Sequence, residues 1–221
     1  MNVSDALNSR YTCRAFKPQP LDKEIILAIL ESANRTPSWA NTQPWEIFVT
    51  GGEVLETLRQ SCLENFRKGI PGNSDIPRAE HWPPAIATRI QGLMAERSKA
   101  LEIDRADEAA RNAIAEQNHR FFGAPAVVFL CLDRILESWS MHDLGMMSQS
   151  IMLEAQEHGV ASAIAYNMVV YPDLIRKVAG IPEDLAIVIG IALGFADDEN
   201  IQNTFRSSRR SLQEAARFRG F

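Results

Sequence analysis

Apolar positions recur at helical spacing in several parts of the chain. Between residues 22 and 34 they fall on one face, at Ile25, Ile26, Ile29, Leu30 and Ala33. Because Asp22 precedes the first of them, the pattern predicts a helix that this side chain can cap. A second helix is predicted over residues 53–68 and a third from Ser138 to His158 and Gly159. Pro172 suits the first turn of a fourth helix, which ends at Gly180.

Four shorter apolar runs predict strands, at residues 46–50, 126–132, 160–165 and 185–193. The second and fourth runs lack polar alternation, which indicates burial on both faces of a sheet. Helices come first and then lie between the strands. The order therefore predicts an α+β protein with three layers, as one domain over residues 1–221.

Two polar regions interrupt this pattern. Residues 70–84 are rich in proline and glycine and predict a loop. From residue 85 to 122 the spacing is helical, with a break expected near Asp104. The segment 197–221 turns basic and ends with Phe218 and Phe221, so we expect it to need an anchor outside its own fold.

Composition narrows the possible functions. The net charge of −5 argues against broad nucleic-acid binding. The longest apolar stretch, residues 185–196, is too short to span a bilayer, and the first ten residues lack a signal-peptide core. The three cysteines form no paired motif, which favours reduced thiols. We therefore expect a cytoplasmic protein without a membrane or nucleic-acid partner.

Motifs for several common chemistries are missing from the sequence. It contains no G-x-G-x-x-G after a strand, no phosphate-binding P-loop and no G-x-S-x-G. The four histidines lack metal-ligand spacing. We expect no metal site, and we expect a bound organic cofactor to carry any difficult chemistry.

Two arginine-rich segments are candidates for holding an anion. Residues 10–16 place Arg10 and Arg14 beside the hydroxyl of Thr12, a set that can bind a phosphate through charge-assisted hydrogen bonds. Residues 206–210 contain three arginines and two serines. Each segment alone also fits an ordinary surface: arginines before a helix, or a solubilising tail.

A third candidate is the segment 37–45, Pro-Ser-Trp-Ala-Asn-Thr-Gln-Pro-Trp. Its two prolines restrict the loop, its amide side chains donate and accept hydrogen bonds, and its two tryptophans offer flat apolar walls. This combination suits a planar heterocycle with polar edges, such as an isoalloxazine. The alternative is a well-packed turn.

These segments together resemble the nitroreductase family. Residues 10–16 are similar to its opening Arg-x-Ser-x-Arg-x-Phe, with Thr12 keeping the hydroxyl, and residues 37–45 match its Pro-Ser-x-x-Asn-x-Gln-Pro-Trp. Residues 117–128, 188–195 and 209–221 resemble later family segments, in the expected order. The resemblance implies a three-layer α-β-α fold with a mixed, mainly antiparallel sheet. It also implies a homodimer in which the tail, residues 197–221, docks on the partner.

The resemblance further implies one FMN at each subunit interface. Arg10, Thr12, Arg14 and the Tyr11 backbone would hold its phosphate, ribityl chain or pyrimidine edge, and Arg209, or alternatively Arg206, would close on the phosphate. The ring would be contacted by three further groups, namely Pro37, Ser38, Trp39 and Asn41 from the partner subunit, Gln117 at the pyrimidine side, and Ala165, Tyr166 and Asn167 near N5.

The implied activity is ping-pong hydride transfer from NADH or NADPH, through flavin N5, to a small flat acceptor such as a nitroaromatic or a quinone. No side chain is nominated as acid or base, because the flavin carries the chemistry. Residues 70–120 would shape the acceptor pocket. The alternatives are other flavin chemistry on this scaffold (dehalogenation, flavin cleavage or oxidation by oxygen), a non-catalytic FMN-binding module, and a helical interaction protein without a cofactor.

Overall fold

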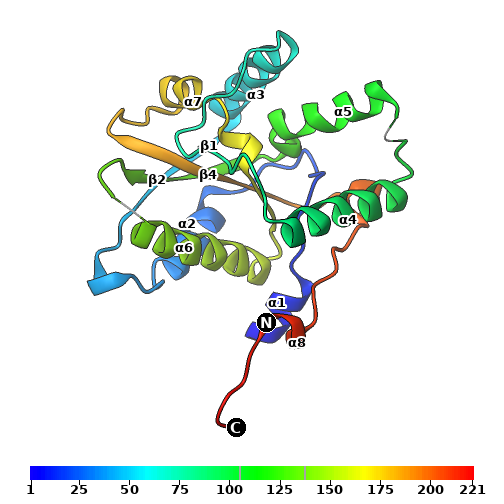
Figure 1. The fold of residues 1–221 in the computed structure, drawn as a ribbon. Helices are drawn as coiled ribbons and strands as arrows, with labels where there is room; N and C mark the ends of the chain where they lie inside the picture. The colour runs from blue at the N-terminus through cyan, green and yellow to red at the C-terminus, as the bar shows by residue number, and fades with distance from the viewer. Residues whose placement is uncertain (105, 137) are drawn as a thin grey trace.

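Helices cover both faces of one four-stranded sheet in the computed structural model, which describes residues 1–104, 106–136 and 138–221 (Figure 1). The strands are β1 (Trp45–Gly51), β2 (Ala126–Asp133), β3 (Ala161–Ala165) and β4 (Leu185–Gly194). They lie in the order β1-β2-β4-β3, and each neighbouring pair is antiparallel. The α+β expectation is confirmed, and every strand end lies within one residue of its prediction.

The central strand β2 divides the hydrophobic core into two halves. Its alternate residues point to opposite faces, with Val127, Phe129 and Cys131 in one cluster and Val128, Leu130 and Leu132 in the other. The second cluster is covered by α2 (Lys23–Ala33) and α6 (Ser138–Glu157), and the first by α3 (Gly52–Arg67) and α7 (Pro172–Ala179). The expected three layers follow from this alternation.

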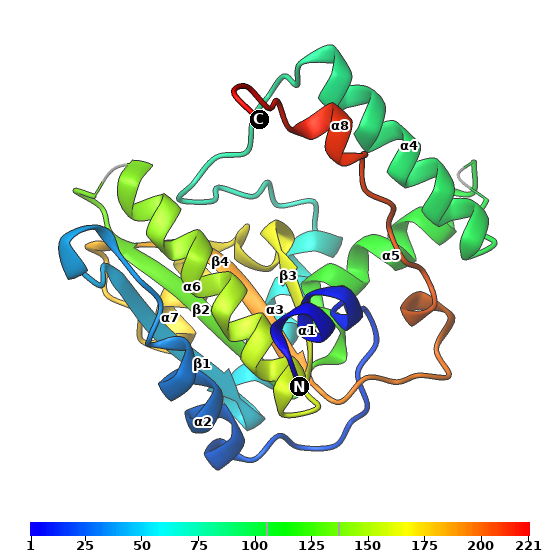
Figure 2. The same cartoon turned by 90° about the horizontal axis from the view of Figure 1, so that it is seen from below.

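The region expected to hold two polar helices does so. These are α4 (Pro84–Ala100) and α5 (Glu108–His119), and the predicted break near Asp104 lies between them. Helix α5 packs on α3, whereas α4 has no buried residue and stands away from the sheet layers (Figure 2). The long face of α4 is therefore free to line a site.

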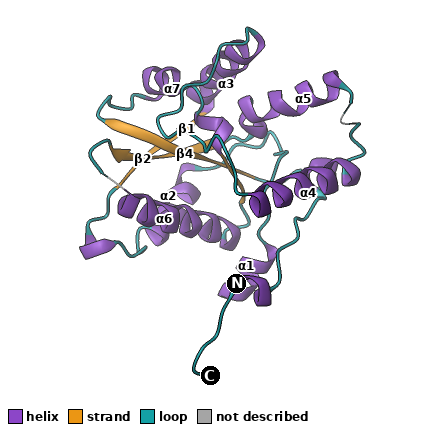
Figure 3. Cartoon of the chain, viewed as in Figure 1, coloured by secondary structure: helices purple, strands orange, loops and turns teal. Residues whose placement is uncertain are grey.

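Both ends of the chain lie outside the layers. Helix α1 (Val3–Ser9) packs against α6, and the C-terminal segment is mostly loop, interrupted by η4 (Ile201–Asn203) and α8 (Leu212–Ala215) (Figure 3). The remaining short helices are η1 (Trp39–Asn41), η2 (Phe121–Gly123) and η3 (Tyr166–Val169). None of the helices in the described ranges combines the length and the apolarity needed to cross a membrane.

Local details of the sheet and helices refine the expectations. The sheet was expected to be mixed and mainly antiparallel; its four strands all pair antiparallel, and parallel pairing is found at an isolated bridge between Thr12 and Ser162. Asp22 does precede α2, but its side chain forms no capping hydrogen bond. Gly180 behaves as expected, because it ends α7 with a left-handed φ of 69°.

Candidate functional site

Backbone hydrogen bonds join the first arginine segment to the end of the sheet. The Cys13 amide donates to the Ser162 carbonyl of β3 at 2.9 Å. The Lys17 amide donates to the Phe195 carbonyl at 2.8 Å, just after β4. Residues 12–17 therefore run beside the sheet, and the position of Arg14 is fixed by the backbone on both sides of it.

Asn203 connects this segment to the tail. Its buried amide accepts from the Arg14 backbone N–H at 2.7 Å and donates to the Ala15 carbonyl at 2.7 Å and the Asp197 carbonyl at 2.9 Å. These three bonds are to backbone groups, so they fix chain positions rather than a charge. Asn203 carries no local sequence signal, because an asparagine in a polar tail is unremarkable until its partners, up to 189 residues away, are known.

A cavity of about 610 Å³ lies where α1, α4 and the tail meet, and we call it the arginine pocket. It is lined by five arginines, namely Arg10, Arg14, Arg97, Arg206 and Arg209. Tyr11 and Thr12 also line it, and no carboxylate occurs among its described lining residues. Both predicted arginine segments thus face one space, together with Arg97 of α4, which the sequence analysis missed.

The arginines of this pocket are positive charges held partly out of water. Burial, with Arg97 nearby, lowers the pKa of Arg14 to about 10. Burial and the neighbouring Arg209 lower the pKa of Arg10, and burial lowers that of Arg97. The Arg97 Nε is buried and has no hydrogen-bond partner in the part of the chain that the structure describes. Such a cluster favours an anion, which would restore the lost solvation.

Tyr11 has a role that the sequence did not predict. The guanidinium carbon of Arg206 lies 3.6 Å from the centroid of the Tyr11 ring, a cation–π contact. Arg206 also donates through Nη1 to the Asn203 carbonyl at 2.6 Å. The Tyr11 side chain therefore holds the tail against the first arginine segment, whereas the resemblance implied a role for its backbone.

Gln117 lies on the other side of Arg14 from the arginine pocket. It comes from α5 and lines a neighbouring cavity of about 320 Å³ together with Arg14 and Phe122. The residues predicted near flavin N5 lie at the end of β3. Thr12 is bridged to Ser162, and Ala165 lies about 10 Å further along that strand. Ala165, Tyr166 and Asn167 do not line the arginine pocket itself.

The loop that contains Trp39, predicted to contact the flavin ring, is held elsewhere. The Trp39 amide donates to the Asp143 carboxylate near the start of α6 at 3.0 Å, whereas the Met1 amino group pairs with Glu157 at the end of α6 at 2.5 Å. With a rise of about 1.5 Å per residue, these points lie roughly 20 Å apart along α6. The structure therefore does not bring Pro37, Ser38, Trp39 and Asn41 to the arginine pocket of their own chain (Figure 2).

This loop has a constrained backbone. Ala40, Asn41 and Gln43 have positive φ values of 48°, 57° and 46°, which are uncommon outside glycine. The Ser38 hydroxyl accepts from the Gln43 amide at 2.9 Å and closes the turn. Trp39 is nevertheless 68% exposed. Backbone strain that leaves an aromatic ring in solvent is typical of a binding loop rather than of a packed turn.

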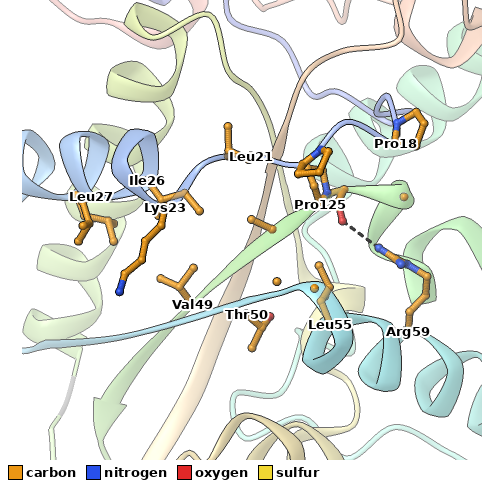
Figure 4. Close-up of a pocket in the computed structure, with 17 residues that line it drawn as sticks. Pro18, Leu21, Lys23, Ile26, Leu27, Val49, Thr50, Leu55, Arg59 and Pro125 are labelled. Atoms are coloured by element: carbon orange, nitrogen blue, oxygen red, sulfur yellow. Dashed lines mark hydrogen bonds between the residues drawn. The ribbon is translucent and has the colours of Figure 1, made fainter.

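A separate, apolar cavity of about 600 Å³ lies between α2, the outer strand β1 and the turn before β2 (Figure 4). We call it the apolar groove. Leu21, Ile26 and Val49 contribute to its lining, and Arg59 crosses its far end by donating to the Ala124 carbonyl at 2.9 Å. It contains none of the predicted site residues, so it suits an apolar segment rather than a phosphate.

Comparison with known proteins agrees with this geometry. Residues 7–195 match the model of the nitroreductase family. The chain is 31% identical to a nitrobenzene nitroreductase of Ectopseudomonas oleovorans, covering 98% of this chain and 96% of that protein. It is 32% identical to a chloronitrobenzene nitroreductase of Comamonas testosteroni, with the same coverage.

Solved structures show the same likeness. The FMN- and NADPH-dependent nitroreductase NfnB of a Sphingopyxis strain superposes with a TM-score of 0.95 at 32% identity, over all of both chains. The FMN-dependent NfnB of Mycobacterium smegmatis, solved with NADPH, superposes with a TM-score of 0.93 at 28% identity, over 98% of this chain and 97% of that chain. The chain belongs to the nitroreductase family.

Proposed function

We propose that this protein is an FMN-dependent oxidoreductase that passes hydride from NAD(P)H to a small flat acceptor such as a nitroaromatic or a quinone. The observation that carries the proposal is the arginine pocket, in which five guanidinium groups from both ends of the chain and from α4 face one cavity, with no carboxylate among the described residues that line it. Relatives similar over nearly the whole chain act on nitrobenzene and chloronitrobenzene.

The pocket fits the phosphate end of FMN. Arg10, Arg14, Arg206 and Arg209 would surround the phosphate, and the partnerless Nε of Arg97 gives a further donor. Thr12 would contact the ribityl chain. When bound, the flavin supplies the redox chemistry at N5. The chain's own residues bind, orient and shield it.

The ring would extend from the pocket toward the sheet. Gln117 would face its pyrimidine edge, because this side chain lies across Arg14 from the phosphate site. Ala165, Tyr166 and Asn167 would lie near N5, because β3 leads from the Thr12 bridge to these residues. The ring-facing loop, with Pro37, Ser38, Trp39 and Asn41, would come from a second subunit.

A homodimer with an exchanged tail accounts for three exposed features. The Trp39 loop lies far from the pocket of its own chain, β1 has a hydrogen-bonded neighbour on one side, and the tail ends with Phe218 and Phe221, which are 70% and 106% exposed. The apolar groove beside β1 would receive the partner's tail. This arrangement would protect both the edge strand and the aromatic side chains.

The test begins with the purified protein, which should be yellow. Anaerobic mixing with NADPH or NADH should bleach the flavin absorbance, and adding nitrobenzene should restore it. The colourless product is then identified as a hydroxylamine or an amine. A flavin that stays oxidised with both donors would falsify the proposal, and so would a reduced flavin that no nitroaromatic or quinone reoxidises.

A further inference from the structure

A second charged cavity adjoins the arginine pocket. It measures about 710 Å³ and lies between residues 88–96 of α4 and residues 207–214. We call it the tail groove. Leu93, Ser207 and Arg209 line both cavities, so Arg209 lies between them. A ligand in one cavity could therefore extend directly toward a ligand in the other.

Helix α4 connects the two cavities through a stripe of residues. Arg89, Leu93 and Arg97 are four positions apart and share one helical face. Arg89 lines the tail groove, Arg97 lines the arginine pocket, and Leu93 lies between them in both linings. At about 1.5 Å per residue, the two arginines are roughly 12 Å apart along the helix axis.

The charge of the tail groove differs from that of the arginine pocket. Arg89, Arg209 and Arg210 line it, but so do Glu96 and Glu214, which leaves an excess of one positive charge. Within the described ranges, none of the three arginines is ion-paired with a carboxylate at 4.0 Å or less. A small positive excess suits a single phosphate group that binds and leaves, whereas the arginine pocket suits a resident one.

We propose that the tail groove binds the 2′-phosphate of NADPH. This inference rests on the proposed function, since the donor must place its nicotinamide against a flavin whose phosphate lies in the adjoining pocket. The adenosine end of the donor is then the part able to reach a second anion site. NADH lacks the 2′-phosphate, so Arg89 and Arg210 would select NADPH over NADH.

The experiment compares the FMN-loaded wild-type enzyme with Arg89→Gln and with the control Lys99→Gln. Lys99 is an exposed cation in the last turn of the same helix and lines neither cavity. KM is measured for NADPH and for NADH, and the binding of 2′,5′-ADP and of 5′-ADP is measured by calorimetry. The calorimetric readout does not depend on turnover.

The proposal expects Arg89→Gln to raise KM for NADPH by about tenfold or more, the loss of a charged hydrogen bond, while KM for NADH and the flavin content stay constant. The variant should also lose the preference for 2′,5′-ADP over 5′-ADP, and Lys99→Gln should keep it. Equal effects on both donors, no effect on either, or a wild-type enzyme without that preference would overturn it. If flavin is absent or neither donor reduces it, the proposed function itself fails. If NADPH and NADH reduce the flavin equally well, only the proposed 2′-phosphate site is contradicted.

Discussion

At the scale of single residues, Arg14 connects more parts of the site than any other predicted residue. It lines the arginine pocket and the Gln117 cavity, and its backbone is held by Asn203. Its charge is partly buried beside Arg97, which is unfavourable until an anion is bound. We therefore expect its guanidinium to contribute more to flavin binding than an exposed arginine would.

Replacing Arg14 by alanine should weaken FMN binding by about 1.5–3 kcal/mol, the range for a hydrogen bond to a charged group. Flavin fluorescence during titration of the apoprotein gives the affinity. Lys177→Ala, which removes an exposed cation from α7, is the matched control and should bind FMN normally. An unchanged affinity for Arg14→Ala would remove this residue from the phosphate site.

The cysteines give a second prediction at this scale. Burial raises the pKa of Cys13 to about 11 and those of Cys62 and Cys131 to about 12, and all three are free. Almost no thiolate then exists at pH 8, and all three side chains are buried. The native protein should not react with a thiol reagent such as dithionitrobenzoate. After unfolding in guanidinium, three thiols per chain should react with it. Rapid reaction of the native protein would contradict this burial.

At the residue scale, the sequence indicated several positions together where they share a motif. Arg10, Thr12 and Arg14 line one pocket with Arg206 and Arg209, and their role in holding the flavin stays a prediction. Arg97 and Asn203 were missed. Their roles depend on partners far away in the chain, and an arginine on a polar helix or an asparagine in a tail has no local signal.

At the scale of elements, the loop before α4 is attached to the end of the sheet by Asp75. The Asp75 carboxylate accepts from the Ile187 amide and from Arg134, each at 2.8 Å, and it contacts Arg176. Arg176 is buried, and it also donates to the Leu185 carbonyl at 2.9 Å. The first half of this loop is therefore fixed before the chain enters α4.

Asp75→Asn should lower the free energy of unfolding by about 3–5 kcal/mol, because Arg176 would keep a buried charge without its main partner. Urea unfolding at pH 7 measures the change. Glu80→Gln, an exposed change in the same loop, is the control and should cost little. If Asp75→Asn lowers the free energy of unfolding no more than Glu80→Gln does, Asp75 is not needed to neutralise Arg176.

The same pair predicts the effect of acid. Burial alone would raise the pKa of Asp75, but the Ile187 amide and the Arg134 and Arg176 guanidinium groups hold it below the ordinary value of 3.8. The stabilisation is therefore fully present above that ordinary pKa and disappears as pH falls through the lower pKa of the folded state. The stability difference between wild type and Asp75→Asn should shrink only below about pH 4.

Elements were more predictable than their contacts. The strands β2 and β4 are buried on both faces, so their apolar runs show in the sequence almost residue by residue. The helix α4 was expected as a polar helix, but its neighbours were not, because a helix without a buried residue carries no apolar stripe that indicates a packing direction. The position of such a helix is set by charge and by loop anchors.

At the scale of the whole molecule, the proposed exchange of tails makes a quantitative prediction. Phe218 and Phe221 are exposed in the single chain, and burying each in a partner's apolar groove would contribute about 1.5–3 kcal/mol. Phe218→Ser combined with Phe221→Ser should therefore shift the protein from dimer toward monomer in sedimentation velocity. It should also weaken FMN binding, because in the proposed dimer the ring-facing loop would come from the partner.

Ile201→Ser is the matched control for the tail. It removes a partly exposed apolar side chain from the tail ahead of its arginines, and it should leave the dimer intact. A double variant that sediments as the wild type does would exclude the two phenylalanines as the anchor. A monomeric wild type that still retains flavin would exclude the exchange as a whole.

The hydrogen bond between the Arg14 amide and the Asn203 side chain can form only late in the synthesis of the chain. These residues are 189 positions apart, so at about 5–20 residues per second Asn203 is translated roughly 10–40 seconds after Arg14. Until then the nascent chain offers only part of the cation set, and a phosphate would meet two or three arginines instead of five. Loading of the flavin should therefore follow the synthesis of the tail, because the complete set of arginines exists only after both ends of the chain have been joined.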